Sequence, residues 1–161
     1  MDVLSLIGFV GAVMAAASTG AMFPPGPWYE RLDKPNWTPP NWLFPIAWTV
    51  LYAAMAYGAA RVAGSGAAVT GAALAFFACQ IALNAIWTPI FFGLRNLGGA
   101  LIGIVALFVA VVTTCLLFWR ADTLAGLLLV PYIAWVGYAG ALNFDIWRRN
   151  GGGFASLPDT P

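Results

Sequence analysis

The sequence predicts an all-α integral membrane protein, a bundle of five transmembrane helices. Of its 161 residues, 61% are hydrophobic and only 8% are charged, whereas soluble domains carry about 25% charged residues. The apolar residues gather in five runs of about 20 residues, the length that a helix needs to cross a bilayer. Such long continuous runs do not show the alternating pattern of barrel strands.

Short gaps with glycines, polar residues and charges separate these runs. Residues 64–66 end the second run, 93–96 the third and 120–122 the fourth, and Asp122 is a good N-cap for the last helix. We expect one domain over residues 1–149 and a Gly- and Pro-rich, disordered tail over 150–161. The expected spans are residues 3–23, 43–62, 67–92, 97–119 and 123–147.

The connection over residues 24–41 is too long for a simple turn between two helices. It is rich in proline, and it carries Trp28, Tyr29 and Trp37, with Trp42 directly after it. A stiff aromatic loop of this kind can fold over the mouth of a helix bundle as a lid. Its aromatic residues can equally form a belt at the membrane interface. The sequence leaves both alternatives open.

Lysine and arginine counts predict the orientation, because these residues favour the cytoplasmic side. The side of the N-terminus holds two of them, Arg61 and Arg120. We therefore expect the N-terminus outside and the C-terminus in the cytoplasm. The opposite side holds five: Arg31, Lys34, Arg95, Arg148 and Arg149.

Several function classes do not fit this composition. The chain has no histidine and a net charge of +1, and without a basic run it is not expected to bind nucleic acid. Cys79 and Cys115 lie in separate apolar runs, so neither a CxxC site nor a disulfide framework is expected. No ionisable residue lies at mid-depth in a span, which argues against ion-coupled transport and against acid–base pairs. We expect no cofactor and no metal.

Two amides in the third span are the clearest polar exceptions. Gln80 and Asn84 are four residues apart and share a helix face, which Trp87 and Phe91 extend. Lipid offers no partner for an amide, so this face is expected to point into the bundle. We interpret Gln80 as an interhelical hydrogen bond and Asn84 as a group at a pocket.

The second and fifth spans carry matching aromatic faces. Trp48 and Tyr52 lie one turn apart. An interior that is aromatic and weakly polar suits a flat, apolar ligand with a few polar edges. In the fifth span, four residues fall within about 80° of one another: Pro131, Trp135, Ala139 and Leu142.

Four blocks of sequence resemble the TspO/MBR family of tryptophan-rich sensory proteins and translocator proteins, also called peripheral-type benzodiazepine receptors. The resemblance runs over about residues 5–149. The blocks occur in the family's order: WYERLDKPNWTPPNW (28–42), FPIAWTVLY (44–52), NAIWTPIFFG (84–93) and PYIAWVGYAGALNFDIW (131–147).

The resemblance implies a five-helix fold, often a homodimer, that binds protoporphyrin and related tetrapyrroles as well as isoquinoline or benzodiazepine-type ligands. It implies a receptor or carrier in porphyrin transport or sensing, in an inner or an outer membrane. Carried onto this chain, the ligand site would comprise Tyr29, Pro39, Trp48, Tyr52, Asn84, Trp87, Leu107, Trp135, Ala139 and Leu142.

Two alternatives remain beside the receptor. Some bacterial members degrade porphyrin with light and oxygen, and the resemblance makes Trp48 and Trp135 the candidates for that activity. A membrane scaffold regulated by tetrapyrrole is the other. Membrane lipid is an expected partner, but tight sterol binding is not, because Phe144 stands where the animal sterol motif has tyrosine and Asp145 adds a charge.

Overall fold

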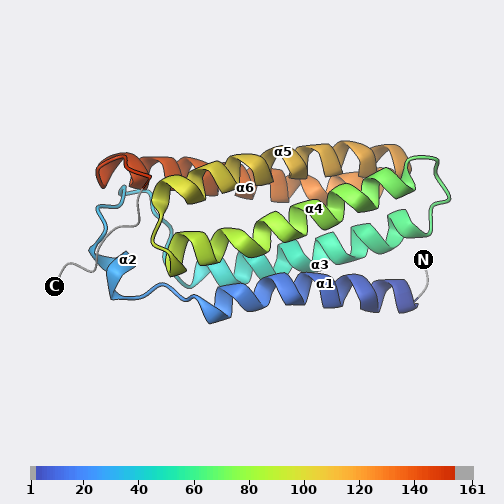
Figure 1. Ribbon diagram of the computed structural model, residues 1–161. Coiled ribbons are helices and arrows are strands. Elements are labelled where there is room, and N and C mark those ends of the chain that lie inside the picture. Colours follow the sequence, from blue (N-terminus) through green and yellow to red (C-terminus); the bar gives the residue numbers. More distant parts are fainter. Residues whose placement is uncertain (1–2, 155–161) are drawn as a thin grey trace.

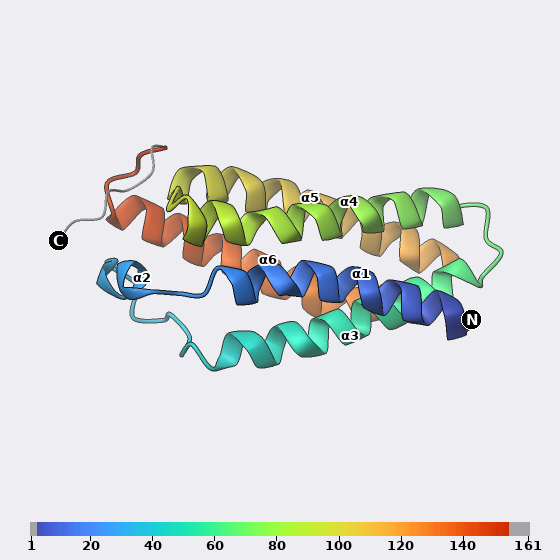
Figure 2. The same cartoon turned by 60° about the horizontal axis from the view of Figure 1, so that its bottom comes forward.

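The computed structural model describes residues 3–154 as a bundle of five long helices that lie side by side (Figures 1 and 2). All five are long and apolar enough to cross a membrane, and the described residues contain no strand. The predicted fold class is therefore confirmed. The long helices are α1 (Val3–Met22), α3 (Leu43–Ala63), α4 (Thr70–Thr88), α5 (Leu97–Ala121) and α6 (Thr123–Arg149).

The five long helices form a closed ring. Around the ring α1 contacts α3, α3 contacts α6, α6 contacts α5, α5 contacts α4, and α4 returns to α1. Figure 1 shows that the start of α1 and the end of α6 lie at opposite ends of the bundle. The interior of such a ring is enclosed by all five spans.

The third span differs from the expected range at both ends. It begins at Thr70 rather than at residue 67, because residues 64–69 form the turn after α3. At its other end α4 continues into a π-helix, η1 (Pro89–Gly93). The Leu94 N–H donates to the Pro89 carbonyl, five residues back, at 2.8 Å. Such wider turns occur mostly within α-helices and often at functional sites.

Asp122 holds the turn between α5 and α6. Its Oδ1 accepts a hydrogen bond from the Ala125 N–H at 2.9 Å, which confirms the expected N-cap. Arg61, in the last turn of α3, donates from Nη2 to Asp122 Oδ2 at 2.7 Å. The hydrogen bond to Arg61, together with the cap, lowers the pKa of the Asp122 carboxyl. One carboxylate thus joins three helices at this end.

The half of the bundle next to Asp122 is densely packed. Most of its fully buried side chains come from α3, α5 and α6, among them Met55, Phe118 and Leu129, and α4 adds Ala73. Gly58 packs so closely that an added Cβ would lie in van der Waals contact with the Ala125 carbonyl and the Phe118 ring, at 3.5 and 3.6 Å. The other half, where α6 ends, is less densely filled and contains the cavity described below.

The first residues of the expected tail fold back on α6. Trp147 Nε1 donates to the Gly153 carbonyl at 2.8 Å, and the Phe154 ring lies 5.7 Å from that of Trp147. Gly151 and Gly152 have φ of +98° and +63°, a conformation that favours glycine and lets the chain reverse. Residues 155–161 of the expected disordered tail lie outside the described residues.

Candidate functional site: an aromatic cavity inside the helix ring

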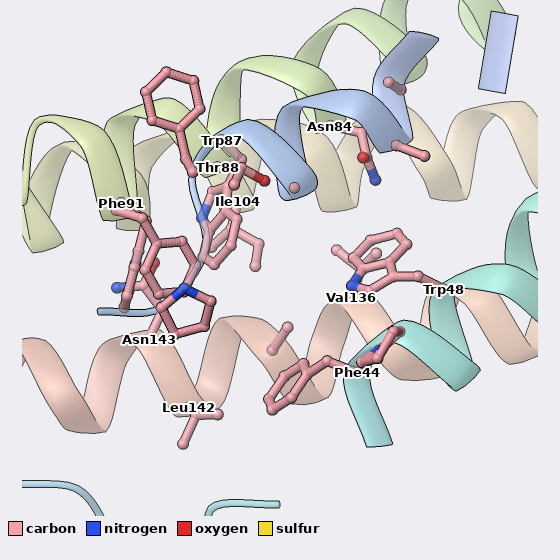
Figure 3. Close-up of a pocket in the computed structure, with 18 of the residues that line it drawn as sticks. Phe44, Trp48, Asn84, Trp87, Thr88, Phe91, Ile104, Val136, Leu142 and Asn143 are labelled. Carbon is pink, nitrogen blue, oxygen red and sulfur yellow. The ribbon is translucent and has the colours of Figure 1, made fainter. Parts of the chain in front are cut away.

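A cavity of about 650 Å³ lies between the five long helices at the end where α6 terminates (Figure 3). This volume is within the range of about 300–1,000 Å³ that small-molecule sites occupy. Among the described residues that line it there is no Asp, Glu, Lys or Arg. The lining is therefore aromatic, aliphatic and weakly polar.

Stacked aromatic pairs form two parts of its wall. On α3, the ring centroids of Trp48 and Tyr52 lie 5.2 Å apart. The ring centroids of Trp87 on α4 and Phe91 on η1 lie 4.9 Å apart. In each pair the angle between the ring planes is only 29°. Trp87 Nε1 donates to the Ala100 carbonyl on α5 at 3.1 Å. That hydrogen bond fixes the indole ring and satisfies its one polar atom.

A hydrogen-bonded chain of side chains crosses the ring beside the cavity. Asn84 Oδ1 accepts from the Tyr52 hydroxyl at 2.8 Å, and Asn84 Nδ2 donates to the Tyr132 hydroxyl at 2.9 Å. Tyr132 donates in turn to Gln80 Oε1 at 2.9 Å, and Gln80 lies 3.7 Å from the Met55 sulfur. Gln80 is fully buried outside the cavity, as expected of an interhelical bond, whereas Asn84 both bonds helices and lines the cavity.

The connection between α1 and α3 covers this end of the cavity. It contains a short helix, α2 (Pro27–Arg31), which Pro27 starts at a position where its missing N–H costs nothing. Trp28 and Tyr29 are only 9% and 5% exposed and pack edge-on against Phe91. Burial raises the pKa of the Tyr29 hydroxyl, and the nearby Tyr138 adds to the effect.

Polar contacts fasten the same connection to the end of α6. The Asp33 N–H donates to Asn150 Oδ1 at 3.1 Å, and Asn150 Nδ2 donates back to the Asp33 carbonyl at 3.0 Å. Further along, the Tyr138 hydroxyl donates to the Trp37 carbonyl at 2.8 Å. Trp37 and Trp42 are 41% and 64% exposed. One part of the loop thus acts as a lid, and the other part presents tryptophans outward.

Eight of the ten expected site residues line the cavity, and two do not. The Trp135 ring packs against the rings of Phe44 and Tyr138, with centroid distances of 5.8 and 6.0 Å. Its buried Nε1 has no hydrogen-bond partner among the described residues. Pro39 lies in the loop away from the lining. Ligand binding by any of the ten stays a prediction. The eight are Tyr29, Trp48, Tyr52, Asn84, Trp87, Leu107, Ala139 and Leu142.

The position of Trp135 follows from the rotation of α6. The face that α6 turns toward the bundle is centred on Tyr132, Val136 and Asn143, all of which are at most 1% exposed. Trp135 is one residue before Val136, about 100° around the helix. It therefore lies at the junction of α3 and α6 instead of on the cavity wall.

Asn143 belongs to the cavity wall although it was not among the residues expected there. Asn143 is 1% exposed and lines the cavity. Its Nδ2 donates to the Leu97 carbonyl at 3.0 Å, while its Oδ1 is buried without a hydrogen-bond partner among the described residues. The signal was available, because Asn143 lies four residues after Ala139 on the same helix face.

Fold and cavity together define a multi-pass helical membrane protein with an aromatic, uncharged internal cavity under a loop. Comparison with known families then identifies it further. The chain belongs to the TspO/MBR family, whose model matches residues 3–148.

Similar proteins come from bacteria and animals. The chain is 54% identical over 145 residues to Protein CrtK of Rhodobacter capsulatus, covering 88% of this chain and 89% of that one. It is 44% identical over 150 residues to the tryptophan-rich sensory protein of Cereibacter sphaeroides, covering 93% and 94%. The human translocator protein is 37% identical over 161 residues, with 95% of each chain covered.

Proposed function

We propose that the protein is a membrane receptor or carrier that binds a tetrapyrrole in this cavity and acts in porphyrin transport or sensing. The observation that carries the proposal is the uncharged cavity of about 650 Å³ with two stacked aromatic pairs in its wall. A flat macrocycle can stack on such rings and fill such a volume. Isoquinoline or benzodiazepine-type ligands are flat and aromatic as well, so we propose them for the same site.

The wall offers a ligand mainly ring faces. The polar atoms of Trp87 and Asn84 are already bonded within the protein. Ligand affinity would therefore depend mostly on apolar and stacking contacts. Trp135 would act indirectly, through its contact with Phe44, which lines the cavity.

A second candidate function is light- and oxygen-dependent degradation of the bound porphyrin. One observation favours it: Trp48 lines the cavity and would lie beside a bound macrocycle. In this case Trp48 would be the residue that takes part in the reaction. Trp135 would contribute less, because it is not among the lining residues.

The test is titration of the purified protein with protoporphyrin IX, in the dark and then under light. We expect saturable quenching of tryptophan fluorescence in the dark, weakened in a Trp87→Leu variant. Trp119→Phe, at an exposed position of α5, is the matched control and should bind as wild type does. Absence of saturable binding to wild type would refute the proposal. A new absorbing product that forms under light, and that a Trp48→Phe variant does not form, would favour the second function.

We also propose that the protein is a homodimer with its N-terminus outside and its C-terminus in the cytoplasm. The end of the bundle with the lid carries five basic residues, whereas the other end carries only Arg61 and Arg120. Labelling of single cysteines placed at Ser65 and at Asn36, in intact cells, tests the orientation. Labelling of the cysteine at position 36 rather than at 65 from outside would show the reverse orientation.

A further inference from the structure

The buried carboxamide of Asn143 forms a hydrogen bond through its nitrogen but none through its oxygen. Its Nδ2 donates to the Leu97 carbonyl at 3.0 Å. The opposite amide orientation would place two acceptor oxygens face to face, so this bond fixes Oδ1 on the other side. Oδ1 is buried and has no partner among the described residues.

This unused acceptor belongs to a residue of the cavity wall. Asn143 lines the cavity together with its neighbours Leu142 and Ile146. In Figure 3 it lies well apart from Asn84 and Trp48. Buried polar atoms are nearly always satisfied in native proteins, so an exception at a cavity wall indicates a partner that arrives from outside the chain.

The two buried amides of the cavity wall differ in this respect. Asn84 has a protein partner at both ends of its amide, Tyr52 at the oxygen and Tyr132 at the nitrogen. Asn143 is saturated on one side only. Of these two amides, only Asn143 has a buried oxygen without any hydrogen-bond partner among the described residues.

The chemistry of the missing partner follows from the surroundings. An acceptor oxygen requires an O–H or N–H group. Because no Asp, Glu, Lys or Arg is among the described lining residues, the cavity offers nothing that would neutralise either a cationic donor or a carboxylate placed next to that oxygen. The donor must therefore be neutral.

We propose that Asn143 Oδ1 accepts a hydrogen bond from a neutral O–H or N–H group at the edge of the ligand, which on a porphyrin with propionic acid side chains is a protonated carboxyl. This inference rests on the proposed function, since it assumes that a tetrapyrrole occupies the cavity. It makes Asn143 a specificity-determining residue: it selects ligands with a donor at that edge over ligands of the same shape without one.

The experiment compares protoporphyrin IX with its dimethyl ester, which keeps the macrocycle but has no O–H group. Dissociation constants are measured in the dark at mildly acidic pH for wild type and for Asn143→Leu, which has a similar volume and no acceptor. We expect wild type to bind the diacid about tenfold more tightly than the ester, and Asn143→Leu to bind both about equally. Such a cycle isolates the contact between one residue and one ligand group.

Leu142→Ala is the matched control. It shortens the neighbouring wall residue without changing a hydrogen-bonding group, so it should weaken both ligands while keeping the preference for the diacid. If Asn143→Leu does not fold, Asn143→Ala makes the same comparison, with the thermal midpoint in detergent as the measure of folding.

The outcomes separate the two proposals. Equal binding of both porphyrins to wild type, or a preference that survives in Asn143→Leu, would overturn the role of Asn143 and leave the tetrapyrrole site standing. Absence of binding of either porphyrin to wild type would overturn the proposed function, and this inference with it.

Discussion

The Tyr52 hydroxyl and the Asn84 carboxamide oxygen lie 2.8 Å apart and join α3 to α4 across the helix ring. Asn84 continues the connection to Tyr132 on α6, so one amide links three helices. All three residues lie in or beside the cavity wall. The amide therefore contributes both to the shape of the cavity and to the stability of the bundle.

Replacing this amide should destabilise the protein. In Asn84→Leu the fully buried Tyr132 hydroxyl loses the N–H group that donates to it. The Tyr52 hydroxyl loses the oxygen that accepts its hydrogen bond. We expect a loss of about 1–3 kcal/mol, the cost of leaving a buried polar group unpaired. The thermal midpoint in detergent measures it. Tyr52→Phe, which removes only one hydrogen bond, should cost less; an equal or larger loss would contradict the role of Asn84 as the link.

Opening of the lid should depend on the reciprocal pair between Asp33 and Asn150. Asn150→Ala removes both hydrogen bonds that hold this part of the loop to α6. We expect porphyrin to dissociate about five- to thirtyfold faster, because the two bonds together contribute about 1–2 kcal/mol. Stopped-flow fluorescence measures the rate. Arg148→Ala, which removes an ion pair to Asp145 rather than a contact with the loop, should leave the rate unchanged.

Stability should fall in acid through Asp122. The hydrogen bond from Arg61 lowers the pKa of Asp122 below that of the unfolded chain. The resulting stabilisation is present above the ordinary carboxyl pKa of about 3.9 and is lost as the pH falls through the lower folded value. In Asp122→Asn, which still caps α6, this acid-dependent part should be absent. Thermal midpoints from neutral to acidic pH test it, with Glu30→Gln, an exposed residue of α2, as the control that retains the dependence.

Filling the cavity from α1 should block the ligand. Ala16 is buried and lines the cavity, whereas Ala15, one residue away, is exposed. Ala16→Phe should lower porphyrin affinity by tenfold or more, on the order of 1.4 kcal/mol, and leave the helical circular dichroism unchanged. Ala15→Phe adds the same ring toward the membrane and should bind normally. Equal binding by both variants would place the ligand outside this cavity.

The sequence predicted the spans well because membrane helices produce long apolar runs that charged or glycine-containing turns interrupt. Asp122 was recognisable as an N-cap for the same local reason. The π-turn at Pro89–Gly93 and the short helix Pro27–Arg31 were not predicted. Both depend on contacts between the ends of different helices, and such contacts cannot be predicted from the local sequence.

The cavity wall was predicted less completely, and Trp135 shows why. In a soluble protein the apolar face of a helix marks the core. In a membrane protein the lipid-facing side is apolar as well, so the pattern does not tell which side of α6 turns inward. Asn143 was missed for a related reason: its unused acceptor becomes visible only once Leu97 on α5 is known to occupy its nitrogen.

The uneven filling of the bundle has a consequence for the route of any cargo. The half near Asp122 is closed by side chains with essentially no exposed surface, such as Met55, Phe118 and Leu129, and the cavity reaches only into the other half. In this conformation a bound molecule can exchange with only one leaflet or one aqueous compartment. Net movement across the bilayer would require those packed side chains to separate. If the protein is the carrier proposed above, this conformation would therefore load and release its ligand on a single side.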